Sequence, residues 1–93
     1  MIVSSPSHFH SLRESHPTSI FLYTKKDCVA CKQMETYLQK KHVFVISTDQ
    51  PNLFPLLHSI TSLPTLERYD YFTLVDSIEG YDIKKIDRFF EKK

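Results

Sequence analysis

Two cysteines three positions apart are the residues of this chain best suited to chemistry. Cys28 and Cys31 are its only cysteines, and their Cys-Val-Ala-Cys motif follows a short apolar run and opens a predicted helix. At a helix start, unpaired N–H groups and the positive end of the helix dipole favour a thiolate. Lys25 and Lys26 add positive potential if their side chains face the sulfur. We predict that Cys28 is the nucleophile of a thiol–disulfide exchange, and that Cys31, one turn further on the buried side, resolves it.

Three other interpretations of the cysteine pair remain open. The pair could form half of a zinc site, which needs two more ligands. The histidines available for this are His8, His10, His16, His42 and His58. None of them has the close downstream pairing that is typical of a zinc module. The pair could also be a plain structural disulfide, or the fold could serve as a partner-binding module with idle cysteines.

The hydrophobic pattern around the cysteines predicts alternating helices and strands. Continuous apolar or alternating runs favour strands, and a spacing of three to four favours helices. The expected helices cover about residues 6–14, 28–40, a short stretch from about 51 and a last segment from about 83. The expected strands cover residues 20–23, 43–46, 64–69 and 72–78. This order implies an early parallel pair and a closing antiparallel hairpin, and therefore an α/β fold with a four-stranded mixed sheet flanked by helices.

Two aspartates precede predicted helices and are suited to cap them. Asp27 stands before the helix of the cysteines, and Asp82 stands before the last helix. A carboxylate at this position accepts hydrogen bonds from the first free N–H groups of the helix. The residues expected on the buried face of the last helix are Ile83, Ile86, Phe89 and Phe90.

Length and composition are those of an ordinary small globular protein. The 93 residues fit a single domain, 1–93, and 41% hydrophobic with 25% charged residues is an average composition. A formal net charge of +1 gives no reason to expect nucleic acid or a membrane as partner. Residues 1–8 lack the pattern of a secretory signal. We expect a cytoplasmic monomer that needs no cofactor.

Three features together resemble the thioredoxin superfamily over about residues 18–93. The first is the cysteine motif between a strand and a helix, and the second is the segment 62–65, Ser-Leu-Pro-Thr. The third is Gly80, the one glycine of the chain. Each feature alone is weak or moderate support, but their order and spacing are specific. The resemblance implies a thioredoxin-like fold and a thiol–disulfide oxidoreductase that acts on protein disulfides and receives electrons from a thioredoxin-reductase-type donor.

The same resemblance implies substrate-binding roles for three residues. Pro64 is expected to follow a cis peptide bond and to pack beside the cysteines. The peptide group of Leu63 is expected to bond the backbone of the substrate as an added strand. Gly80 is expected to form part of the flat surface on which the substrate docks.

The chain also departs from the thioredoxin pattern. It has no tryptophan, and Asp27 stands where thioredoxins have one. Leu22 and Val45 replace the buried aspartate and its lysine partner, so Cys31 must lose its proton by another route, such as water or Glu35. The first half is similar to glutaredoxins, but Tyr81 follows Gly80 where these have a second glycine. We therefore expect no dedicated glutathione site.

Overall fold

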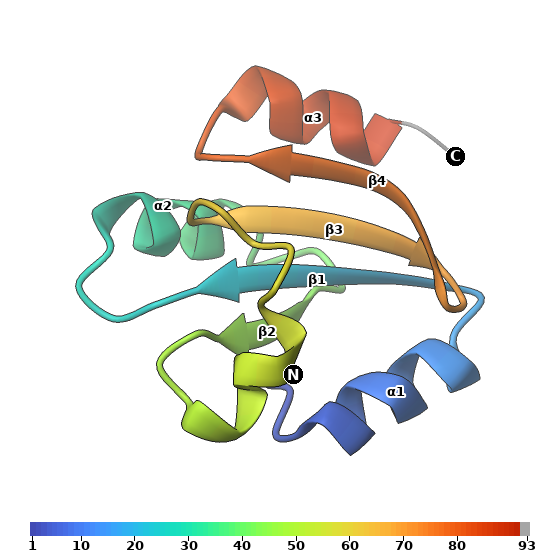
Figure 1. Ribbon diagram of the computed structural model, residues 1–93. Coiled ribbons are helices and arrows are strands. Elements are labelled where there is room, and N and C mark those ends of the chain that lie inside the picture. The colour runs from blue at the N-terminus through green and yellow to red at the C-terminus, as the bar shows by residue number, and fades with distance from the viewer. Residues whose placement is uncertain (92–93) are drawn as a thin grey trace.

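The computed structural model describes residues 1–91, and its centre is a four-stranded sheet (Figure 1). The strands are β1 (Thr18–Thr24), β2 (Phe44–Ser47), β3 (Thr65–Asp70) and β4 (Thr73–Glu79). Their order in the sheet is β2-β1-β3-β4. Strand β1 pairs parallel to β2 and antiparallel to β3, and β3 and β4 form an antiparallel hairpin. The predicted mixed sheet, with its parallel pair and closing hairpin, is confirmed.

Alternate residues of the central strand β1 face two separate hydrophobic clusters. Phe21 and Tyr23 lie in one cluster together with α1 (Pro6–Ser15) and the 3-10 helix η1 (Pro51–Leu56). Leu22 lies in the other cluster, with side chains of the two remaining helices. Because side chains alternate along a strand, a continuous apolar run is the pattern of a strand covered on both faces.

The two remaining helices cover the face that Leu22 contacts. They are α2 (Val29–Tyr37), with Met34 buried, and α3 (Ile83–Glu91), with Ile86 and Phe89 buried. Figure 1 shows α1 and α3 on opposite sides of the sheet. None of the helices within residues 1–91 is long and apolar enough to cross a membrane.

Helix α2 is shorter than its sequence pattern predicts. It ends at Tyr37 rather than near residue 40. The N–H of Gln39 bonds to the carbonyl of Thr36, and the N–H of Lys41 bonds to that of Leu38. Both bonds span three residues, which tightens the chain into turns and ends the α-helix.

The short helix after β2 forms, but as a 3-10 helix. Pro55 lies inside it, and a proline has no N–H to donate to the carbonyl four residues earlier. The N–H groups of Leu53 and Leu57 instead bond to carbonyls three residues back. Pro55, which disfavours an α-helix at this position, is therefore compatible with a 3-10 helix.

Helix α3 begins as predicted, but one of its four expected buried residues is exposed. The side-chain oxygen Oδ1 of Asp82 accepts from the N–H groups of Lys84 and Lys85, at 3.0 and 3.3 Å, so its capping role is confirmed. Ile83 is 46% exposed, which makes the prediction for it wrong. It is the first residue of the helix, and the packing against the sheet begins one turn later, at Ile86.

Candidate active site

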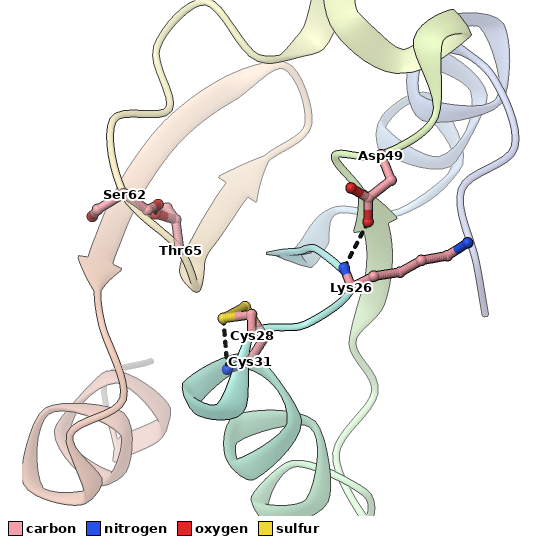
Figure 2. Close-up of a disulfide and its surroundings, with 6 residues drawn as sticks. All are labelled: Lys26, Cys28, Cys31, Asp49, Ser62 and Thr65. Atoms are coloured by element: carbon pink, nitrogen blue, oxygen red, sulfur yellow. Dashed lines mark hydrogen bonds between the residues drawn. A yellow bond between two sulfur atoms is a disulfide. The ribbon is translucent and has the colours of Figure 1, made fainter.

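Cys28 and Cys31 form a disulfide at the junction between β1 and α2 (Figure 2). Cys28 is the N-cap residue of α2, and its sulfur accepts a hydrogen bond from the N–H of Cys31 at 3.2 Å. Cys28 is partly exposed, whereas Cys31 is 1% exposed. The predicted positions of both thiols, one at the helix start and one buried a turn further, are confirmed.

The prediction that Asp27 caps this helix is wrong. The backbone of Asp27 has a φ of 56°, in the left-handed region, whereas an N-cap residue has extended backbone angles. Cys28 has these extended angles, with φ −118° and ψ 105°. The cap position therefore falls on Cys28, and its sulfur accepts the N–H of Cys31 in the first turn of the helix.

The loop that precedes the cysteines is fixed to the segment that follows β2. The backbone N–H of Lys26 donates to Oδ2 of Asp49 at 2.6 Å. Figure 2 shows the side chain of Lys26 directed away from the two sulfurs. Lys25, in contrast, lines the same pocket as Cys28. Of the two lysines considered from the sequence, Lys25 is thus the one that lines a pocket together with Cys28.

The Ser62–Thr65 loop faces the disulfide in Figure 2. The peptide bond between Leu63 and Pro64 is cis, as the family resemblance implied. Leu63 lines the pocket that also contains Cys28, and Pro64 is buried. The hydroxyl of Thr65 donates to the carbonyl of Ser62 at 2.7 Å and closes the loop around the proline.

Gly80 joins this loop from the end of β4. Its N–H donates to the carbonyl of Pro64 at 2.7 Å, and its φ is +80°. A left-handed backbone of this kind is easy for glycine and strained for other residues. The structure thus brings Leu63, Pro64 and Gly80 together with the cysteines at one end of the sheet.

Two further residues, for which the sequence predicted no role in the site, stabilise its loops. Asp49 anchors the cysteine loop, and Thr65 anchors the proline loop. The sequence signal for Asp49 is an acidic residue shortly after a strand, where loops commonly use a carboxylate to bind backbone N–H groups.

Leu22 and Val45, the residues that depart from the thioredoxin pattern, lie directly opposite one another. They are partners in the register between β1 and β2. Leu22 is 1% exposed and packs against Met34 and its neighbours in the cluster under α2 and α3. Glu35 is an exposed residue of α2, four positions after Cys31.

A metal site around the cysteines finds no support in the geometry. Within residues 1–91, no group of three or more His, Cys, Asp or Glu side chains is placed to hold a metal ion. A structural zinc site takes four such ligands. The zinc interpretation of the cysteine pair therefore lacks its remaining ligands in the part of the chain that the structure describes.

Comparison with known proteins relates the fold to thioredoxins. No protein-family model and no curated protein sequence matches the chain. Among solved structures, an oxidised thioredoxin from Plasmodium falciparum is 26% identical, with a TM-score of 0.82 over 98% of this chain and 94% of that one. A second Plasmodium falciparum thioredoxin structure, 24% identical, gives a TM-score of 0.85 over 98% and 96% of the two chains.

A yeast protein extends the comparison to a more distant sequence. Oxidised mitochondrial thioredoxin 3 from Saccharomyces cerevisiae is 18% identical and gives a TM-score of 0.84 over 100% of this chain and 94% of that one. The agreement covers nearly the whole length in each case, including the strand-to-helix junction with its cysteines. The chain is a thioredoxin-fold protein with the Cys28–Cys31 redox pair at the active-site position of that fold.

Proposed function

We propose that this protein is a thiol–disulfide oxidoreductase that reduces disulfides of partner proteins through Cys28 and Cys31. One observation carries the proposal. Cys28 is partly exposed and its sulfur receives a helix N–H, and the buried Cys31 is bonded to it through the disulfide. A hydrogen bond from the first turn of a helix stabilises a thiolate, which is the nucleophilic form of a thiol.

Exchange proceeds in two balanced steps from the dithiol form. The Cys28 thiolate attacks one sulfur of a substrate disulfide, and the other substrate sulfur leaves as a thiolate and takes up a proton. The Cys31 thiol loses its proton, and its sulfur attacks Cys28 Sγ and expels the second substrate sulfur. Two electrons pass from the protein dithiol to the substrate disulfide, and the protein is left with the disulfide seen in Figure 2.

The loop of the cis proline and the end of β4 form the proposed docking surface. Leu63 would bond the substrate backbone through its peptide group, Pro64 would pack beside the cysteines, and Gly80 would leave room for the approaching chain. Three observations support this assignment: Leu63 shares a pocket with Cys28, Pro64 is buried, and the N–H of Gly80 donates to the Pro64 carbonyl.

The proposed partners are a disulfide-containing protein and a thioredoxin-reductase-type donor that restores the dithiol. A matched structure, 13% identical, concerns thiol resolution in a yeast mitochondrial 1-Cys peroxiredoxin via glutathione/thioredoxin systems. A peroxiredoxin is therefore one class of substrate to test. We further propose that the protein acts as a monomer in the cytoplasm, in keeping with its near-zero net charge and two-cysteine content.

Trapping the mixed disulfide tests the proposed roles of the two cysteines. Cys31→Ser removes the resolving thiol, so we expect the variant to accumulate a covalent complex with a disulfide substrate such as insulin. Cys28→Ser is the matched control and should accumulate none, because the thiol that remains is buried. Non-reducing electrophoresis followed by mass spectrometry identifies the linked cysteine. A complex formed through Cys31 in the Cys28→Ser variant, or none in either variant, would contradict the assignment.

A further inference from the structure

Cys28, which is partly exposed, lines a pocket of about 340 Å³ between the cysteine loop and the cis-proline loop. Leu57, Ile60 and Leu63 give it an apolar wall, and the first two belong to the segment after η1. Thr48 and Ser62 add polar groups. A pocket with one apolar wall and a few polar groups fits a side chain that has a methylene stem and a polar end.

Lys25 supplies the charge of this pocket. Of the described residues that line it, Lys25 alone carries a charged side chain. Thr61 also lines the pocket, but its hydroxyl already donates to Oε1 of Glu79 at 2.8 Å. An incoming carboxylate would therefore depend on Lys25, with Thr48 and Ser62 as further hydrogen-bond donors.

We propose that this pocket selects substrates that carry a glutamate close to the cysteine under attack. The inference rests on the proposed function, because the occupant arrives as part of a disulfide substrate. Cys28 itself lines the pocket, and successive residues of an extended chain are about 3.3–3.6 Å apart. A side chain one or two residues from the target cysteine is therefore within reach of the pocket while that cysteine reacts. Its methylenes would pack on the apolar wall and its carboxylate would pair with Lys25.

Rates of peptide reduction test this selection directly. The substrates are disulfide-linked peptides with glutamate at one of the two positions on either side of the cysteine, each matched by a glutamine peptide. The reduced protein is mixed with excess peptide, and its own oxidation is followed at low ionic strength. At one of these positions we expect glutamate to raise the second-order rate about two- to fivefold over glutamine, as for an exposed ion pair. Added salt should weaken the effect.

Two lysine variants separate a local contact from overall charge. Lys25→Met should remove the glutamate advantage, so that this variant reacts with the glutamate and glutamine peptides at equal rates. Lys26→Met is the matched control, because it alters the net charge equally at a side chain that Figure 2 shows directed away from the sulfurs. It should retain the advantage.

The possible outcomes distinguish a failure of the proposed glutamate selectivity from a failure of the proposed oxidoreductase activity. Equal rates for glutamate and glutamine at every position, or an advantage that survives Lys25→Met, would overturn the proposed selectivity while leaving the oxidoreductase intact. An advantage lost equally in both lysine variants would also overturn it, in favour of a general charge effect. Failure of the wild-type protein to reduce any peptide faster than Cys28→Ser would instead overturn the proposed function.

Discussion

At the scale of single residues, the sulfur of Cys28 takes over the role of a helix cap. Sequence reasoning placed this cysteine at the helix start and its partner on the buried side, since both follow from apolar spacing. It assigned the cap to Asp27 because aspartate is a strong cap residue. Asp27 has a left-handed backbone in the loop between β1 and α2, which an N-cap residue does not adopt, so the cap falls on Cys28 instead.

The capping bond predicts an acidic, reactive thiol at Cys28 in the reduced protein. We expect the rate of its alkylation by iodoacetamide to rise with a midpoint below ~8.5, the ordinary pKa of a cysteine thiol. The helix N–H of Cys31 that reaches the sulfur favours the thiolate. Quenched alkylation from pH 5 to 10, followed by mass spectrometry, measures this midpoint. In the Cys31→Ser variant, Cys28 is the one cysteine that can react. A midpoint at or above the ordinary value would count against activation by the helix.

At the scale of helices and strands, periodicity identified the elements and local bonds set their ends. Residues 20–23 and 43–46 lie within or beside the observed strands, because continuous apolar runs suit positions covered on both faces. The end of α2 at Tyr37 and the 3-10 form of Pro51–Leu56 depend on turn bonds and on Pro55. Such bonds leave little trace in hydrophobic spacing.

Helix α3 should lose stability when its cap is removed. Asp82→Ala deletes the acceptor of two backbone N–H groups, and we expect the free energy of unfolding to fall by about 1 kcal/mol. Asp82→Ser retains a capping oxygen and should recover most of this loss. Urea unfolding of the wild type and the two variants, all in the oxidised state, measures the free energy of unfolding. Equal losses in the alanine and serine variants would contradict a capping role.

At the scale of the whole molecule, a polar cluster is buried among the hydrophobic residues on the α1 side of the sheet. Glu67 is 3% exposed, and its Oε1 accepts a weak hydrogen bond from the hydroxyl of Tyr69 at 3.4 Å. Burial, with the nearby Glu67 carboxylate, raises the pKa of Tyr69 to about 12 and the pKa of Tyr23 still further. The sheet order was predictable from the sequence, but this cluster was not, because it joins residues of β1 and β3 that only the register brings together.

Tyr69 should make the stability of the protein depend on pH in the alkaline range. Its pKa is higher in the folded state than the unfolded value of about 10, so the fold holds the proton more tightly. The resulting stability is fully present below pH 10 and is lost as pH rises toward 12. Between pH 9.5 and 11.5 we expect Tyr69→Phe to lose about 1 kcal/mol less than the wild type, after allowance for partial exposure.

A matched variant isolates this effect from the titration of other groups. Tyr71→Phe removes an exposed tyrosine at the turn between β3 and β4 and should lose as much stability as the wild type. Urea unfolding of the oxidised proteins at the two pH values gives the comparison. The same pH dependence in all three proteins would show that the Tyr69 hydroxyl does not contribute.

Reduction of insulin by dithiothreitol tests most directly whether this thioredoxin-fold protein transfers electrons through Cys28. The precipitation of the insulin chains is followed as turbidity, with and without catalytic amounts of protein. We expect the wild type to shorten the time to precipitation in proportion to its concentration, and Cys28→Ser to match dithiothreitol alone. A wild-type rate no higher than that of Cys28→Ser would contradict the assignment of the disulfide in Figure 2 as a catalytic pair.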